Sequence, residues 1–270
     1  MSDRERPTFV VGDVHGHRAE LGVALQAAGL LDDDGDWAGG DAQVWFLGDF
    51  VDRGPDGIGV IDLVMRLVEQ ATEAGGSVDT LLGNHEVLML GMHAFGDTEV
   101  PSDFGVRSFE RSWLLNGGRP EDIEGLTDEH LQWLRGRPVI AHAADHLLLH
   151  SDTTAYLEWG GDAESINAAV HEVLAGDDLP EWWEIWRRMT TRYAFRGPDG
   201  PEVAGLMLQR LGGSRIVHGH SVIADQLGVA PAEVTEPLLY AGEKVLAVDG
   251  GVFIGGPMLV VPLPFQEEAA

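Results

Sequence analysis

Five short motifs hold residue types that can bind metal ions and transfer protons. In the first, GDVHG, Asp13 and His15 stand two residues apart. Residues two apart in an extended chain point the same way, so this carboxylate and this imidazole would face one point. Oxygen and imidazole nitrogen ligands suit divalent ions such as Mn²⁺, Fe²⁺ or Zn²⁺ when no thiolate is present, and the chain has no cysteine.

The other four motifs follow in the order GDFVDRG, GNHE, LLLH and VHGHS. Their candidate functional residues are Asp49, Asp52, Arg53, Asn84, His85, His150, His218 and His220. One such motif has an ordinary explanation, because an Asp after a strand usually caps a helix or forms a turn. Five motifs in succession, each at a predicted strand end, are better explained by a shared site.

The stretches before the first three motifs predict the strands that would aim these side chains. Residues 8–11, 43–47 and 77–82 are β-rich apolar runs, and each run stops at the glycine of a motif. Apolar residues at helical spacing predict helices at 18–31 and 58–68. Strands and helices therefore alternate as in an α/β sheet, whose sites lie at the strand ends.

The chain from about residue 94 onward is expected to contain both helices and strands. We expect a mainly helical insertion at about 94–137 and helices at about 164–212. The expected strands are 147–149, 215–217, 244–248, 252–254 and 258–261. The sequence contains no long linker, so we expect a single domain over residues 1–270. The helix expected at 181–192 carries a group of tryptophans that would pack in the core or line a substrate groove. The group consists of Trp182, Trp183 and Trp186.

The chain is strongly acidic, with 17 Lys plus Arg against 45 Asp plus Glu and a net charge of −28. Nucleic acids and anionic membranes are normally bound by basic surfaces, so we expect neither as a partner. The lack of cysteine excludes a Cys nucleophile and a disulfide framework. No stretch has the length and hydrophobicity of a signal segment or a membrane span, which predicts a cytoplasmic protein.

Taken together, the motifs resemble those of the phosphoprotein-phosphatase branch of the calcineurin-like metallophosphoesterases. The stretch AGGSVDTLLGNHEVLML, with Leu82 before GNHE, is most similar to the bacterial Shewanella-like phosphatases. The resemblance implies an α/β fold in which two mixed β-sheets lie between layers of helices, a four-layer α-β-β-α sandwich. It also implies two divalent metal ions, for which we expect Mn²⁺, with Fe or Zn as alternatives.

Position by position, the resemblance implies that Asp13 and His15 hold one ion and that Asp49 bridges both. The second ion would be held by Asn84, His150 and one histidine of the HGH triplet. We expect this to be His220, because the family motif has Gly-His followed by Thr or Ser. Two such ions carry four positive charges, so an acidic chain could still bind a phosphate.

The remaining roles follow from exclusion and from weaker likeness. His85 is next to a predicted ligand and would point elsewhere, so we expect it to protonate the leaving oxygen while Asp52 orients it. Arg53 is expected to bind the substrate phosphate. Arg196 is a second candidate, although a surface arginine in a Gly/Pro loop is an equally good explanation. The chain departs from the family pattern at Leu82, where many members have Arg, and at 151–152, where Ser-Asp replaces Gly-Gly.

The expected activity is therefore hydrolysis of phosphoesters by a hydroxide that two metal ions activate. The expected substrate is a phosphorylated protein, with phosphoserine, phosphothreonine or phosphotyrosine, or a small phosphoester. Hydrolysis of dinucleoside polyphosphates or other nucleotides is the main alternative. A DNA-repair nuclease fits less well, because those relatives usually have GNHD and lack DRG. A non-catalytic binding module of the same fold is the alternative from another class. The sequence does not indicate an oligomeric state.

Overall fold

The first β-sheet carries three of the five motifs. The computed structural model describes residues 6–100 and 105–266. The sheet has the order β3-β2-β1-β9, in which the first three strands are parallel and β9 runs antiparallel to β1. The strands are β1 Thr8–Val11, β2 Gln43–Phe46, β3 Ser77–Thr80 and β9 Val260–Leu263. The three predicted strands of this sheet are present, so their carboxyl ends meet at one edge.

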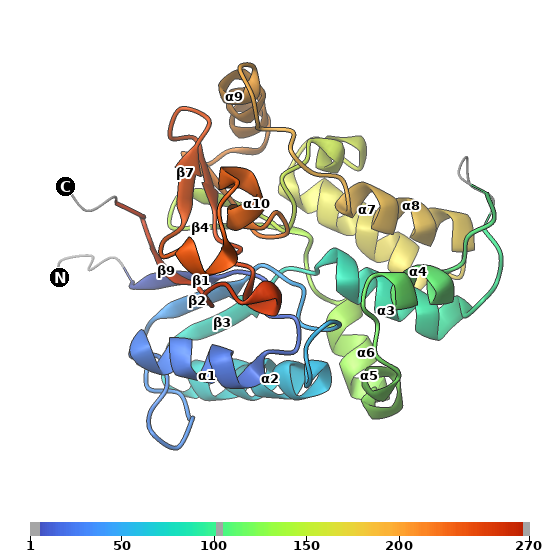
Figure 1. The fold of residues 1–270 in the computed structure, drawn as a ribbon, viewed down its shortest axis with the longest axis horizontal. Helices are drawn as coiled ribbons and strands as arrows, with labels where there is room; N and C mark the ends of the chain where they lie inside the picture. Colours follow the sequence, from blue (N-terminus) through green and yellow to red (C-terminus); the bar gives the residue numbers. More distant parts are fainter. Residues whose placement is uncertain (1–5, 101–104, 267–270) are drawn as a thin grey trace.

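Two helices connect these strands and cover the outer face of the sheet (Figure 1). They are α1 Arg18–Ala27 and α2 Gly57–Glu73. The side chain of Asp56 accepts a hydrogen bond from the Gly59 backbone N–H and so caps the start of α2. The helix α2 buries an apolar face that includes Val60, Val64 and Leu67.

The second sheet carries the other two motifs and has the order β4-β5-β6-β8-β7. Its three central strands are parallel, and both edge strands are antiparallel to their neighbours. The strands are β4 Ile140–Ala143, β5 His146–Leu149, β6 Arg215–His218, β7 Leu238–Tyr240 and β8 Val245–Ala247. Both sheets are thus mixed, as the family resemblance implied.

A buried apolar cluster lies between the two sheets and has members on both. These members are Val10, Leu47, Leu81, Ala143, Leu148, Val217, Leu246, Val248, Val261 and Leu263. Burial of such side chains typically contributes about 1.5–3 kcal/mol each, so this layer holds the two sheets in register. Outside the second sheet, α7 (Ala163–Ala175) contacts β4 and α9 (Gly200–Leu211) contacts β6, which completes the predicted α-β-β-α layers.

Most of the remaining helices form a block beside the sheets (Figure 1). Those before β4 are α3 Asn84–Phe95, α4 Phe109–Leu115, α5 Pro120–Gly125 and α6 Asp128–Arg135. The longer ones after β5 are α7 Ala163–Ala175, α8 Leu179–Met189 and α9 Gly200–Leu211, followed by the short α10 Ile223–Leu227. Three short 3₁₀ turns complete the fold, η1 Ala155–Glu158, η2 Pro231–Glu233 and η3 Val252–Ile254.

The tryptophans of α8 serve mainly as core residues. Trp182 and Trp183 are buried and belong to the large apolar cluster, while Trp186 is half-buried against it. Trp183 and Trp186 also line a cleft of about 300 Å³ on the surface. None of the helices in the described part of the chain has the length and hydrophobicity needed to span a membrane.

Two sequence-based expectations about secondary structure were wrong or incomplete. Residues 252–254 form a 3₁₀ turn and not a strand, because Gly251 and Gly255 on either side adopt left-handed conformations, with φ of 76° and 89°. The edge strands β4 and β7 had no predicted counterpart. Each has only three or four residues and pairs on one side only, so the sequence carries little alternation to reveal it.

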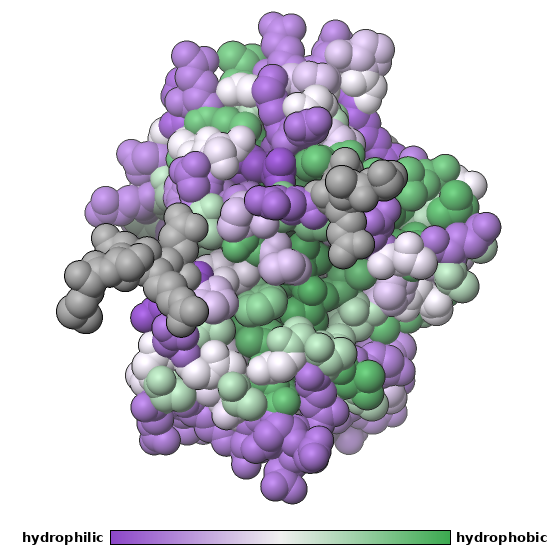
Figure 2. Space-filling model, turned by 90° about the vertical axis from the view of Figure 1, so that its left-hand side faces the viewer, coloured by the Kyte–Doolittle hydropathy of each residue, from purple (hydrophilic) through white to green (hydrophobic). Residues whose placement is uncertain are grey.

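The face that carries both ends of the described chain lies away from the motifs. There, apolar side chains gather in the middle of the surface, between polar regions (Figure 2). Thr8 at the start of β1 pairs with Leu263 at the end of β9, which places this face at the amino ends of the parallel strands. The site residues follow the carboxyl ends, at the opposite side of the sheet.

Candidate metal centre and active site

Backbone strain is concentrated at the predicted site. Ten non-glycine residues in the described part of the chain have a positive φ, and five of these were predicted as site residues from the sequence. They are His15, Asp49, Asp52, Arg53 and His220, with φ between 44° and 68°. Such conformations cost on the order of 1–3 kcal/mol each and persist only where the surroundings enforce them. The strand-end turns are therefore shaped to aim particular side chains.

The strand ends bring four predicted ligands, together with His85, into two buried groups that share one carboxylate. Ligand atoms of His15, Asp49 and His85 all lie within 4.8 Å of one another. The same holds for Asp49, His150 and His220. Asp13 stands beside the first group, with Oδ2 3.9 Å from His15 Nε2. Asp49 belongs to both groups, so one carboxylate could contact two ions.

Hydrogen bonds to backbone carbonyls define which imidazole nitrogen of each histidine carries the lone pair. His15 Nδ1 donates to the Val51 carbonyl at 2.9 Å, which leaves the lone pair on Nε2. His220 is the reverse, because its Nε2 donates to the Thr190 carbonyl at 3.2 Å and leaves Nδ1 free. Burial lowers the pKa of both histidines well below the usual range, so the rings are neutral at pH 7.

Two hydrogen-bond acceptors, His150 Nε2 and Asn84 Oδ1, face each other in the site. Such a pair is stable only when a proton donor or a cation lies between the two atoms. His150 Nδ1 donates to the Leu47 carbonyl at 2.8 Å, so Nε2 is an acceptor in the neutral ring. Nε2 lies 2.8 Å from Asn84 Oδ1, which is also an acceptor. Burial lowers the pKa of His150, which disfavours a second proton on the ring. The facing lone pairs fit a shared metal ion.

Buried carboxylates give the site an excess of negative charge. Burial, together with Asp249 and Asp49, raises the pKa of Asp13 well above its usual range. Burial and the nearby Asp49 raise the pKa of Asp249 and that of Glu86 to about 7. Burial opposes the charged form of Asp49, but His150, His85 and other neighbouring histidines hold its pKa well below the usual value. Divalent cations would stabilise all four carboxylates in the ionised form.

Asp249 is a site residue that the sequence reasoning missed. It is fully buried, lies two residues after the end of β8 and accepts a hydrogen bond from the Gly251 backbone N–H at 2.9 Å. Its charge acts on Asp13, as described above. The signal was available, since Asp249 follows a predicted strand and precedes Gly250-Gly251, the same arrangement as in the motifs.

His85 and Asp52 form the hydrogen-bonded pair that was predicted for proton transfer. His85 Nδ1 donates to Asp52 Oδ2 at 2.7 Å. The other oxygen of Asp52 accepts from Trp113 Nε1, also at 2.7 Å, and both side chains of the pair are buried. The contact with Trp113 on α4 fixes the carboxylate, which in turn fixes the orientation of the imidazole ring.

Arg53 reaches into the same site. Its Nη1 donates to His15 Nε2 and its Nη2 donates to His85 Nε2, each at 2.9 Å. The guanidinium carbon lies 4.1 Å from the centre of the Phe253 ring, which covers it from the side of η3. Arg53 therefore presents its charge next to the predicted metal ligands and the predicted acid.

Glu86 joins the turns after β2 and β3. Its Oε2 accepts from the backbone N–H groups of Asp49 and Gly83, at 2.8 and 2.9 Å. Its Oε1 accepts from the Phe50 N–H at 2.7 Å. The carboxylate thus satisfies three buried donors and holds the strained turn at Asp49 against the start of α3.

Comparison with known families supports the resemblance seen in the motifs. Residues 6–224 match the family model described as calcineurin-like phosphoesterase. The chain belongs to the calcineurin-like phosphoesterase family.

Named relatives in this family fall into two groups. The chain is 33% identical over 139 residues to Shewanella-like protein phosphatase 2 of Arabidopsis thaliana, covering 50% of this chain and 34% of the relative. It is 29% identical over 182 residues to a symmetrical bis(5'-nucleosyl)-tetraphosphatase of Bordetella pertussis, covering 67% of this chain and 54% of the relative. The chain thus spans about a third to a half of the length of these curated relatives.

Solved structures of the family have the same architecture. The cold-active protein-tyrosine phosphatase of a psychrophilic Shewanella species superposes with a TM-score of 0.72 at 25% identity. The superposition covers 96% of this chain and 75% of that structure. A serine/threonine phosphatase of Saccharomyces cerevisiae, at 14% identity and a TM-score of 0.56, has a similar fold.

Arg196 and Arg192 occupy different places in this phosphoesterase fold. The Arg196 guanidinium stacks on Tyr193, 3.6 Å from the ring centre, and lines a cleft of about 460 Å³ together with Tyr240. The charge of Arg192, in contrast, acts on His150 and His220 and contributes to their lowered pKa values. Arg192 was missed in the sequence, although it lies only four residues before the predicted Arg196.

His218 is engaged in hydrogen bonds away from the two ligand groups. Its Nδ1 donates to the Gly219 carbonyl and its Nε2 accepts from the Tyr240 hydroxyl, both at 2.8 Å. Neither nitrogen is free for a metal ion.

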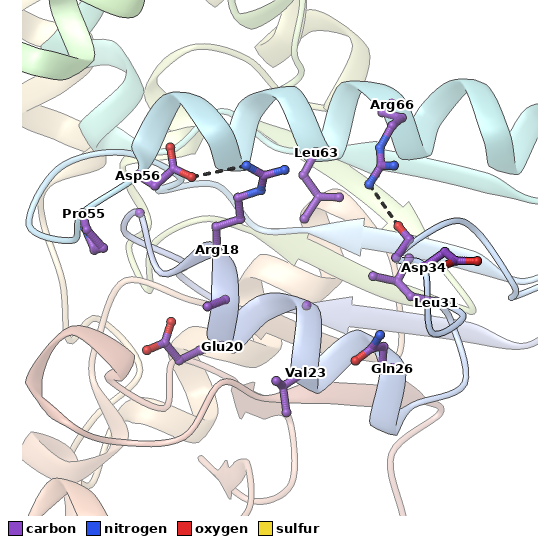
Figure 3. Close-up of a pocket in the computed structure, with 14 residues that line it drawn as sticks. Arg18, Glu20, Val23, Gln26, Leu31, Asp34, Pro55, Asp56, Leu63 and Arg66 are labelled. Atoms are coloured by element: carbon purple, nitrogen blue, oxygen red, sulfur yellow. Dashed lines mark hydrogen bonds and ion pairs between the residues drawn. The ribbon is translucent and has the colours of Figure 1, made fainter.

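A cleft on the surface lies away from this chemistry. It has a volume of about 590 Å³ and lies between α1 and α2 (Figure 3). Its arginines are already paired, Arg18 with Asp56 at 3.4 Å and Arg66 with Asp36 at 2.8 Å. None of the predicted metal ligands lines it.

The role of Glu86 can be tested with Glu86→Gln in chelator-treated protein. A glutamine offers one acceptor oxygen to three buried donors and turns an NH₂ group toward at least one of them, so we expect a loss of about 2–4 kcal/mol in the free energy of unfolding. Urea denaturation measures this loss. The exposed Glu124→Gln on α5 is the matched control and should change stability by less than about 0.5 kcal/mol. Equal stability of both variants would contradict the assignment.

Proposed function

We propose that this chain is a metal-dependent phosphoester hydrolase with a dinuclear centre. The observation that carries the proposal is the position of Asp49, which belongs to both buried ligand groups. Two divalent ions bound there would supply a hydroxide at neutral pH for in-line attack on phosphorus and would polarise the phosphoryl oxygens. We further infer that residues 1–270 act as one catalytic domain, since one large apolar cluster runs from Val11 to Val245.

The proposed ligand nitrogens are those that do not donate to a backbone carbonyl; His15 Nε2, which accepts from Arg53 Nη1, would exchange that hydrogen bond for the ion. Asp13 and His15 Nε2 would hold the first ion, together with Asp49. Asn84 Oδ1, His150 Nε2 and His220 Nδ1 would hold the second, again with Asp49. We propose Mn²⁺ as the native metal, with Fe or Zn as alternatives, because the ligands are oxygen and imidazole nitrogen only.

The side chains around these ligands would handle the substrate and the proton. Arg53 and Arg192 are cations beside the site and are suited to bind phosphoryl oxygens through charge-assisted hydrogen bonds. His85, as imidazolium, would donate its Nε2 proton to the leaving oxygen. Asp52 would stabilise that imidazolium through the 2.7 Å hydrogen bond to Nδ1.

The proposed substrate is a phosphorylated protein, which the likeness to Shewanella-like protein phosphatase 2 and to the Shewanella protein-tyrosine phosphatase supports. A dinucleoside polyphosphate is the second candidate, since the likeness to a bis(5'-nucleosyl)-tetraphosphatase covers 67% of this chain. The net charge of −28 argues against nucleic acids and anionic membranes as partners. We place the activity in the cytoplasm, and a parallel assay of phosphopeptides and diadenosine tetraphosphate would separate the two substrates.

Metal dependence is the direct test of the proposed activity. The chelator-treated protein should not hydrolyse p-nitrophenyl phosphate, and added Mn²⁺ should restore turnover. Asp49→Asn should abolish the restored activity because the shared carboxylate is lost. Absence of turnover with Mn²⁺, Fe²⁺ and Zn²⁺ alike would favour a non-catalytic binding module.

A substitution of His85 can show whether this residue acts as the proton donor or as a metal ligand. His85→Asn should lower kcat on an alkyl phosphate by about 10²–10⁴, the usual contribution of general acid catalysis, and by much less on p-nitrophenyl phosphate. The variant should still bind two Mn²⁺ ions in calorimetric titration. Loss of one bound ion would instead make His85 a metal ligand, which its Nε2, 4.0 Å from Asp49 Oδ2, could reach.

Substitutions of Arg192 and Arg196 should affect the KM for p-nitrophenyl phosphate differently. Arg192→Ala should raise KM for p-nitrophenyl phosphate by about 10-fold or more, as expected for a charged hydrogen bond to phosphate. Arg196→Ala should change KM less than about 2-fold, because its guanidinium stacks on Tyr193. The reverse result would restore Arg196 as the phosphate-binding residue predicted from the sequence.

A further inference from the structure

A buried carboxylate lies two residues after His150. Asp152 is 0% exposed and stands where the family pattern has the second glycine of Gly-Gly. A polar side chain without access to water is tolerated only when hydrogen bonds replace the lost hydration. The partners of Asp152 therefore show what it is there to hold.

Asp152 connects three segments that are far apart in the sequence. Its Oδ1 accepts from the Ser221 hydroxyl at 2.5 Å. Its Oδ2 accepts from the Tyr193 backbone N–H at 2.8 Å, and its backbone carbonyl accepts from the Ala194 N–H at 2.9 Å. The turn after β5, the loop after α8 and the turn after β6 are thus tied to one side chain.

Each of these segments carries a residue of the proposed active site. Asp152 itself follows the proposed ligand His150. Ser221 directly follows the proposed ligand His220. Tyr193 directly follows Arg192, which is proposed above to bind phosphate. Asp152 and the two residues that its carboxylate binds therefore lie one or two positions along the chain from His150, Arg192 and His220.

The backbone next to these contacts is strained. His220 and Tyr193 both have left-handed backbone conformations, with φ of 62° and 73°. A non-glycine residue keeps such a conformation only when its neighbours hold it. The hydrogen bonds to Asp152 act on Tyr193 and on the residue after His220. The loop at Thr190 then accepts from His220 Nε2 and leaves Nδ1 free for the metal.

We propose that Asp152 is a positioning residue for the second metal site and for Arg192. This inference rests on the proposed function. Asp152 does not contact the ion or the substrate. It orients His220 Nδ1 through its hydrogen bond to Ser221. Its hydrogen bonds to Tyr193 and Ala194 fix the conformation of the loop that carries Thr190 and Arg192.

Substitutions at Asp152 should have graded effects. Asp152→Ala removes both contacts and leaves the Ser221 hydroxyl and the Tyr193 N–H buried without a partner. Asp152→Asn keeps the shape, because its oxygen can accept from Tyr193 while its NH₂ donates to Ser221 Oγ. The asparagine variant should therefore rescue most of what the alanine variant loses.

A matched pair of serines gives the control. Ser221 and Ser151 are both fully buried, and each directly follows a proposed ligand histidine. Ser221 donates to Asp152, whereas the hydrogen bond of the Ser151 hydroxyl within the described residues is to the Tyr156 hydroxyl, at 3.4 Å. Ser221→Ala should thus share the defect of Asp152→Ala, and Ser151→Ala should not.

The experiment is calorimetric titration of Mn²⁺ into the chelator-treated wild type and these four variants. For Asp152→Ala we expect one ion to bind with wild-type affinity and the other about 10–100-fold more weakly, the usual effect of losing a residue that orients a metal ligand. Asp152→Asn and Ser151→Ala should stay within about 3-fold of the wild type. At saturating Mn²⁺, Asp152→Ala should also raise the inhibition constant of inorganic phosphate, because Arg192 is displaced.

Wild-type affinity for both ions in Asp152→Ala and Ser221→Ala would overturn the inference. So would equal losses in Ser221→Ala and Ser151→Ala, which would indicate only a general packing defect. If Asp152→Ala does not fold, the two serine variants decide the matter. A wild type that binds no Mn²⁺ would overturn the proposed function itself, whereas two bound ions without turnover would leave the positioning role testable by the same titrations.

Discussion

The site depends on an electrostatic imbalance that the fold creates at the carboxyl ends of its parallel strands. Asp13, Asp49, Asp249 and Glu86 are all buried there, together with neutral imidazoles whose lone pairs converge. Burial of several ionised carboxylates in one place is unfavourable unless cations are near, and Arg53 supplies only one positive charge. This constraint explains why a chain of net charge −28 can still build a local site for an anionic group. Bound divalent ions would convert the most negative part of the interior into a cationic one.

The two sheets and the strained turns together aim the ligands. The first sheet supplies Asp13, His15, Asp49 and Asn84 from the ends of three neighbouring parallel strands, and the second supplies His150 and His220 from β5 and β6. The apolar layer between the sheets brings these two sets together. Left-handed conformations at His15, Asp49 and His220 then turn the side chains inward. Carboxylates such as Glu86 and Asp152 hold these turns through backbone and hydroxyl donors. Apolar packing thus positions the sheets, and hydrogen bonds orient the ligands.

Much of this arrangement could be predicted from the sequence because the motifs are short, ordered and placed directly after apolar runs. The strands at 8–11, 43–46 and 77–80 and the grouping of Asp49 with His150 and His220 are examples. The parts that were missed depend on contacts distant in the sequence. Asp249 and Arg192 gain their importance from which side chains face them, and η3 is a turn because two glycines adopt positive φ. Residue type alone does not reveal such properties.

The central claim is that Asp49 is shared by two metal ions. The most direct test is anomalous X-ray diffraction from crystals of the chain grown with Mn²⁺. The account predicts two anomalous peaks roughly 3.5–4 Å apart, the usual spacing of two-metal sites, with Asp49 in contact with both. A single peak, or two peaks of which only one lies next to Asp49, would contradict it.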